Sequence, residues 1–96
     1  MDHRLGRRRR TRTLVEVRSG RGVRAAGLVC NISRDGMFVL CEPTPEINDS
    51  VDVYMSMGLK SVRIPGFVVH RRTNGVGMIF RDLDEPARAV VEKCLR

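Results

Sequence analysis

Two stretches of this chain hold side chains whose types and spacing suit the binding of a ligand. The first is the hexapeptide Asn31–Gly36, which reads Asn-Ile-Ser-Arg-Asp-Gly and lies between two apolar runs. Such a segment predicts a tight polar connection between two strands. Its Asn and Ser side chains can hydrogen-bond either their own backbone or a ligand, and Gly36 allows a close approach of the backbone.

The second stretch is an arginine-rich run at the start of the chain. Residues 1–12 contain six arginines and one aspartate, a net charge of +5, whereas the other residues contain 12 basic and 10 acidic side chains, a net charge of +2. Arginine forms bidentate contacts with phosphates and stacks on bases. The run therefore favours an anionic partner. Sequence-neutral nucleic-acid binding, attachment to an anionic membrane and a solvated tail remain as other interpretations.

The rest of the composition narrows the class of protein. No apolar run approaches the roughly 20 residues of a membrane span, and no signal-peptide segment follows the basic start, so we expect a cytoplasmic protein. The wide spacing of Cys30, Cys41 and Cys94 favours reduced thiols. With only His3 and His70 available, we expect neither a metal site nor an enzyme.

The chain is expected to fold as a single domain over residues 13–96, preceded by a flexible arginine-rich arm over residues 1–12. Alternating apolar residues and turn signals predict six strands: Leu14–Arg18, Val23–Ile32, Met37–Cys41, Ser50–Met57, Ser61–Arg72 and Val76–Phe80. Pro86 and the apolar spacing after it predict a short helix over about 85–95. Six strands in hairpin succession and one C-terminal helix indicate an all-β dominated fold, a small antiparallel barrel.

The order of these features resembles the PilZ domain, over nearly the whole chain. The arm contains the pattern Arg-x-x-x-Arg. The hexapeptide follows the pattern Asn-x-Ser-x-x-Gly, with Asn31, Ser33 and Gly36 at its defined positions. Before the helix, Gly75–Leu83 reads Gly-Val-Gly-Met-Ile-Phe-Arg-Asp-Leu. The resemblance implies a six-stranded PilZ-like β-barrel.

The resemblance also implies binding of the bacterial second messenger cyclic di-GMP. In that family the arginine motif meets the phosphates and guanine faces, and the second motif meets a guanine edge. The ligand-binding residues that it predicts in this chain are Arg4, Arg8, Asn31, Ser33 and Gly36. The other frame of the arginine motif is Arg8 to Arg12. Secondary candidates are Arg7, Arg12, Arg34, Arg71 and Arg72.

The expected function is that of a stand-alone receptor in the bacterial cytoplasm, which binds cyclic di-GMP and relays the signal to a protein effector. A motility, secretion or polysaccharide system could be that effector. Some PilZ proteins have lost nucleotide binding and act through protein contacts, so an adaptor with an idle site is the first alternative. A non-specific nucleic-acid binder that uses the arm is the second. We expect no cofactor, no stable nucleic-acid complex and no membrane span.

Overall fold

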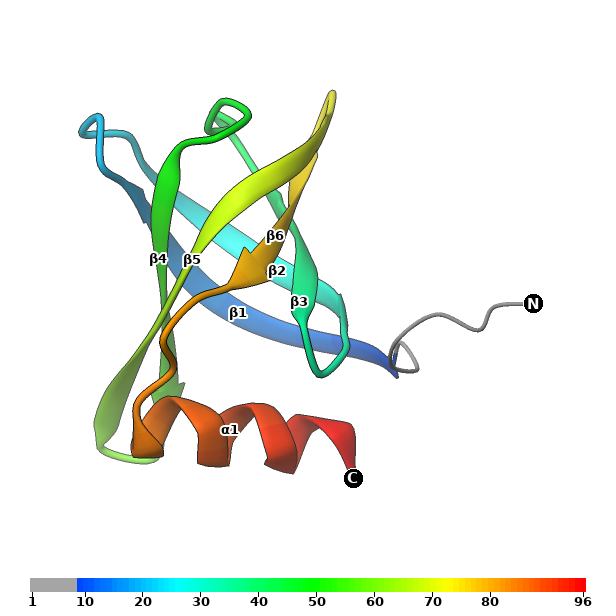
Figure 1. Ribbon diagram of the computed structural model, residues 1–96, viewed down its shortest axis with the longest axis vertical. Coiled ribbons are helices and arrows are strands. Elements are labelled where there is room, and N and C mark those ends of the chain that lie inside the picture. Colours follow the sequence, from blue (N-terminus) through cyan, green and yellow to red (C-terminus); the bar gives the residue numbers. More distant parts are fainter. Residues whose placement is uncertain (1–8) are drawn as a thin grey trace.

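Six antiparallel strands close into a barrel with the order β1-β2-β3-β6-β5-β4, in a computed structural model that describes residues 9–96. Figure 1 shows the strands wrapped around one interior, with the helix across one end of the barrel. The elements are β1 (Arg9–Ser19), β2 (Arg24–Ile32), β3 (Gly36–Cys41), β4 (Ser50–Met57), β5 (Lys60–Arg72), β6 (Gly75–Phe80) and α1 (Glu85–Leu95). The expected fold class, a six-stranded antiparallel barrel with a C-terminal helix, is confirmed.

Alternate residues of each strand point into the barrel and fill it with aliphatic side chains. Val29, Val39, Val53, Ile64 and Val68 are completely buried. Each such side chain contributes roughly 1.5–3 kcal/mol relative to an exposed position, and this burial is the main source of the fold's stability. A ligand site therefore has to lie on the outside or at the ends of the barrel.

Helix α1 begins where the sequence supplies a cap. The Asp84 side chain accepts a hydrogen bond from the backbone N–H of Ala87 at 2.9 Å, and a proline occupies the first turn. Such a cap stabilises a helix by about 1 kcal/mol. Ala87, Val90 and Val91 are buried against the barrel, so α1 closes the end that it crosses in Figure 1.

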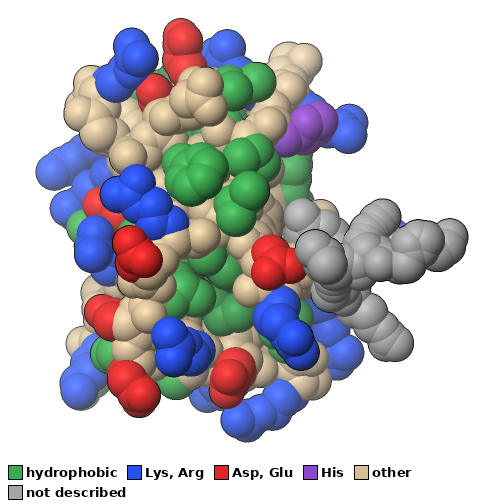
Figure 2. Space-filling view, in the orientation of Figure 1, with side chains coloured by type: hydrophobic (Ala, Val, Ile, Leu, Met, Phe, Trp, Pro, Cys, Tyr) green, Lys and Arg blue, Asp and Glu red, His purple; other side chains and the backbone are tan. Residues whose placement is uncertain are grey.

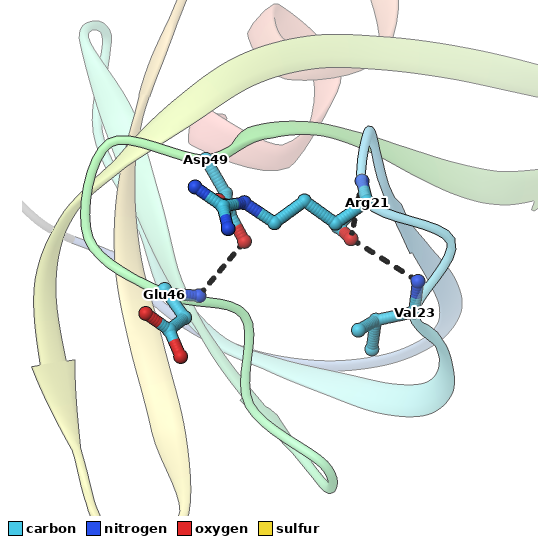
Figure 3. Close-up of polar contacts among 5 residues, drawn as sticks. Arg21, Val23, Glu46 and Asp49 are labelled. Carbon is cyan, nitrogen blue, oxygen red and sulfur yellow. Dashed lines mark hydrogen bonds and ion pairs between the residues drawn. The ribbon is translucent and has the colours of Figure 1, made fainter.

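The opposite end of the barrel is held by polar contacts between two loops (Figure 3). Asp49, whose side chain is only 4% exposed, forms an ion pair with Arg21 at 2.8 Å and accepts a hydrogen bond from the backbone N–H of Glu46 at 3.0 Å. The hydroxyl of Ser19 accepts hydrogen bonds from the backbone N–H groups of Arg21 and Val23. These bonds join the β1–β2 hairpin to the loop before β4.

The first strand begins earlier than the sequence pattern indicated. Arg9–Arg12, which we assigned to the flexible arm, form the start of β1, and Arg9 and Arg10 pair with β2. These residues belong to the strand because their backbone groups hydrogen-bond to β2. Their side chains bury little apolar surface, so the apolar pattern of the sequence did not reveal them. The remaining residues of the expected arm, 1–8, lie outside the described part of the chain.

Candidate functional site

The strand register brings the arginine run to the hexapeptide turn. In the β1–β2 pair, Arg9 lies opposite Ile32 and Arg10 lies opposite Asn31. A register shift between Arg10 and Thr13 marks a bulge, and the exposed Arg12 lies within it. The two stretches singled out by their chemistry are therefore neighbours in space. Arg4, Arg7 and Arg8, the other predicted arm residues, lie outside the described residues.

Asn31 has an unusual environment at this place. Its side-chain oxygen is buried and has no hydrogen-bond partner within residues 9–96. A buried polar atom without a partner is costly, and in a native protein it calls for an explanation such as a bound ligand. Asn31 also follows a register shift between Val29 and Asn31 in the β2–β3 pair, and such bulges re-aim side chains. The amide oxygen is thus a buried acceptor without a described partner, on the residue opposite Arg10.

Ser33 holds the shape of the turn. Its hydroxyl accepts hydrogen bonds from the backbone N–H groups of Asp35 and Gly36 and donates one to the carbonyl of Gly36, each at 3.3 Å. The backbone N–H of Ser33 also donates to that carbonyl at 2.8 Å. A hydroxyl has one donor and two acceptor positions, so the internal bonds use its whole capacity in this conformation.

Gly36 is required by packing between strands. A Cβ atom at this position would overlap the carbonyl oxygen of Met78 on β6. A hydrogen bond also ties the turn to β6, because the backbone N–H of Phe80 donates to the carbonyl of Asp35 at 2.8 Å. The hexapeptide is therefore a rigid platform tied to β6.

A groove of about 540 Å³ separates this turn from the last part of α1. It is lined by apolar and charged side chains, namely Arg34, Leu83, Arg88, Val91, Glu92, Leu95 and Arg96. Ligand sites of this kind combine apolar walls with a few polar groups, over volumes of roughly 300–1,000 Å³. A hydrogen bond of 2.7 Å from the Arg9 guanidinium to the main-chain oxygen of Arg96 connects the groove to the arginine run.

The arginines around the turn are not neutralised locally. Among the described residues, Arg10, Arg12 and Arg34 have no ion pair with a carboxylate. The Arg88 guanidinium donates to the carbonyl of Leu83 at 3.1 Å, which fixes its position at the groove. Of these arginines, Arg34 and Arg88 line the groove, together with the carboxylate of Glu92. Guanidinium groups with free donors attract anions, and phosphate is the anion that their geometry matches best.

Two of the secondary candidates lie elsewhere. Arg72 pairs with Gly75, which in turn lies opposite Leu40 at the far end of β3 from Gly36, about 13 Å away along the strand. Arg71 precedes Arg72 and donates to the hydroxyl of Thr44 at 3.1 Å. The structure therefore does not bring Arg71 and Arg72 to the hexapeptide turn.

Sequence reasoning missed the contribution of the helix. Arg88, Glu92 and Arg96 follow one another at intervals of four residues, which places them on one face of α1. That spacing was a usable signal, but nothing in it shows that the face meets the hexapeptide turn. The roles of Arg9 and Arg10 were missed because they depend on strand register.

Other kinds of chemistry have little support in the described chain. Burial raises the pKa of the Cys41 and Cys94 thiols, which makes both poor nucleophiles at neutral pH. Within residues 9–96, no three His, Cys, Asp or Glu side chains are placed to hold a metal ion. Nor is any helix in that range long and apolar enough to cross a bilayer.

Comparisons with known proteins point to one family. A family profile described as the PilZ domain matches residues 2–96. The PilZ domain of CeSA from a cellulose-synthesizing bacterium superposes with a TM-score of 0.75 at 14% identity, over 94% of this chain and 99% of that one. The PilZ domain of YcgR from Escherichia coli, solved with c-di-GMP, gives 0.74 at 9% identity, over 96% and 88%.

A third structure is larger than this chain. The inhibitor of motility MotI/DgrA from Bacillus subtilis superposes with a TM-score of 0.72 at 13% identity, over all of this chain and 51% of its own. At these identities the structural likeness concerns the fold. No curated protein matches the chain in sequence.

Proposed function

The chain belongs to the PilZ domain family, as its motifs indicated, and we propose that it binds cyclic di-GMP at the hexapeptide turn and relays the signal to a protein effector. PilZ domains act as receptors or adaptors and not as enzymes. Cyclic di-GMP is a messenger of the bacterial cytoplasm, so the proposed receptor works there. It needs no cofactor besides its ligand.

The observation that carries the proposal is the pairing of Arg10 with Asn31. It supports a site in which phosphate-binding and base-reading groups belong to one rigid pair of strands. In the proposed complex, Arg4 and Arg8 reach over the same turn, and Arg7 and Arg12 assist them. Forked guanidinium donors bind the two phosphodiesters and the guanine O6 and N7 acceptors, and their planar faces stack on the bases.

The unpartnered oxygen of Asn31 supports a specific role in the proposed site. Guanine carries N–H donors at N1 and at its 2-amino group, whereas adenine has neither. An acceptor placed opposite the guanine N1–H would therefore prefer guanine, because adenine has a bare acceptor nitrogen at N1 and its only base donor, the 6-amino group, lies at a different position. Ser33 and Gly36 serve the site by keeping the turn in shape, and Arg34 adds a cation beside it.

The test is isothermal titration of the protein with cyclic di-GMP at near-physiological salt, with cyclic di-AMP as the comparison ligand. We expect saturable binding that strongly prefers cyclic di-GMP. Arg8→Ala and Asn31→Ala should each weaken it by about tenfold or more, since each removes a hydrogen bond to a charged or buried group. Arg63→Ala is the matched control, because Arg63 lies on β5 and pairs with Asp52 at 3.0 Å.

One observation favours a second candidate, an adaptor that binds no nucleotide. The Ser33 hydroxyl is saturated by bonds inside the turn, as it would be if the motif were purely structural. Absence of heat with both dinucleotides at high micromolar concentration would support this adaptor and reject the receptor. Equal binding of the two dinucleotides would instead indicate a general binder of polyanions.

A further inference from the structure

Strand β3 is apolar on both of its faces. Its sequence is Gly-Met-Phe-Val-Leu-Cys, with Met37 and Val39 completely buried inside the barrel. Phe38 and Leu40 point outward and are half-buried. Antiparallel strands with one wet face normally alternate between apolar and polar residues. An outward face of this composition indicates that something covers it in the working protein.

Three leucines continue this surface across neighbouring strands. Leu14 on β1 lies opposite Leu28 on β2, and Leu28 lies opposite Leu40 on β3. The residues after them, Val15, Val29 and Cys41, are buried, so all three leucines project outward. Leu14 is 78% exposed. We call the outward side chains of Leu14, Leu28, Leu40 and Phe38 the leucine face.

The surface is flat at its β3 edge. A Cβ atom on Gly75 would lie 3.0 Å from the ring of Phe38, so the aromatic ring rests on the backbone of β6. Since Leu28, Leu40 and Phe38 are only half-exposed, they form a shallow platform from which Leu14 protrudes. The buried core of a protein interface is apolar, and an exposed aliphatic side chain such as Leu14 can fill a pocket of a partner there.

Two arginines that are unpaired among the described residues lie at opposite ends of the leucine face, and the one carboxylate of β1 between them, Glu16, is paired with Arg18. The exposed Arg12 precedes Leu14 by two residues on β1, and the exposed Arg24 lies opposite Arg18 at the other end of the strand pair. Arg18 is occupied, because it pairs with Glu16 at 3.1 Å and lies 4.3 Å above the ring of Tyr54. Arg12 and Arg24 have no carboxylate partner among the described residues.

From this arrangement we propose that the leucine face docks a protein partner whose contact surface has an apolar centre and carboxylates around it. The inference rests on the adaptor part of the proposed function and names the surface that the effector uses. A second copy of this chain would bring the unpaired arginines of two such faces together, which like-charge repulsion opposes. An anionic membrane is the other occupant, and vesicle sedimentation tests it.

A second apolar area lies on another side of the barrel, over β5 and β6 (Figure 2). Val69 and Ile79 are 43% and 39% exposed there. Ile79 lies opposite Gly36, so this area borders the proposed nucleotide site. The leucine face also meets that site, where Phe38 lies opposite Asn31, but its Leu14 is far more exposed, at 78%. We therefore assign the partner to the leucine face.

The experiment uses a photocrosslinking amino acid at position 14 in the source bacterium. The matched control carries it at position 59, because Leu59 in the β4–β5 turn is a fully exposed leucine away from the leucine face. We expect a discrete protein adduct from position 14 and none from position 59. The adducted protein is then purified, and its affinity for the unlabelled chain is measured with and without cyclic di-GMP.

Three results together support the inference. Leu14→Ser should weaken the measured affinity by about tenfold or more, whereas Leu59→Ser should leave it unchanged. Arg24→Glu should also weaken it and reduce its salt dependence, whereas the exposed Arg81→Glu should not. Leu14→Ser should leave the cyclic di-GMP titration intact.

Other outcomes overturn it. An adduct between two copies of the chain would indicate self-association. Sedimentation of the wild type, but not of Leu14→Ser, with anionic vesicles would indicate a membrane surface. Adducts from both positions alike, or no adduct at all, would also reject the inference. The nucleotide proposal fails separately: if leucine-dependent docking occurs without any binding of cyclic di-GMP, the inference holds and only the receptor is rejected.

Discussion

Arginines flank the loops at both ends of the barrel, but the two ends use them differently. At one end, Arg21 is paired at 2.8 Å with the buried carboxylate of Asp49 (Figure 3), which also fixes a loop N–H. At the other end, Arg10, Arg12 and Arg34 surround the hexapeptide turn with no described carboxylate as a partner. The first arrangement has its charges paired, and the second leaves its described arginines without an acidic partner.

Under the proposed function, this difference separates structural arginines from those assigned to the ligand. A chain with 16 arginines gives no reason from composition alone to prefer one over another. The local balance of charge does, because an arginine with a buried acidic partner has little to gain from a phosphate, whereas an unpaired one gains a charge-assisted hydrogen bond. Three substitutions test this contrast between the two ends.

The largest effect is expected from Gly36→Ala at the turn. The added methyl group would overlap the Met78 carbonyl on β6, so the β3–β6 pair must shift, at an expected cost of about 3 kcal/mol or more. Chemical denaturation measures the loss. Gly58→Ala is the control for a glycine in a turn. Its φ is +68°, but nothing lies within 4 Å of its Cβ position, so a methyl group there meets no neighbour. A smaller loss for Gly36→Ala than for Gly58→Ala would contradict this account.

An intermediate effect is expected from Asp49→Ala at the opposite end. It leaves the backbone N–H of Glu46 without its acceptor and should cost about 1–3 kcal/mol of unfolding free energy. Affinity for cyclic di-GMP should stay unchanged. Asp49→Asn keeps an acceptor and should recover part of the loss. Weaker nucleotide binding by folded Asp49→Ala would show that the two ends are not independent.

The smallest change in stability is expected from Arg12→Ala, compared directly with Arg21→Ala. Arg12 is exposed and unpaired among the described residues, so its loss should leave the thermal midpoint within about 1 °C while it weakens cyclic di-GMP binding severalfold. Arg21→Ala should lower the midpoint and leave binding intact. If the two variants show the opposite pattern, the assignment of roles to the two ends is wrong.

Much of the fold follows from local signals. The helix predicted over about 85–95 is found at Glu85–Leu95 because Asp84 and Pro86 mark its start. The strand Ser50–Met57 has the predicted bounds because its apolar residues alternate. The predicted start of the first strand, Leu14, was wrong by five residues, because β1 begins at Arg9. Arginines contribute no apolar pattern, and only their pairing with β2 reveals them.

The candidate site was predictable in its turn and less so in its surroundings. Asn31, Ser33 and Gly36 form a recognisable motif, but their separate roles depend on contacts with residues distant in the chain, such as Met78 and Phe80. The positions of Arg10 and Arg12 depend on a bulge that no local pattern specifies. The groove exists only because α1 folds back toward the turn.

The contact between Arg9 and the main chain of Arg96 has a consequence for the architecture of larger proteins. It means that the chain enters and leaves this fold at nearly the same point. A unit with adjacent entry and exit points can be inserted into a loop of another protein without stretching its host. We expect such a unit to tolerate circular permutation as well, and a short linker joining residue 96 to residue 9 would test whether the barrel keeps its fold when new termini are opened at the β4–β5 turn.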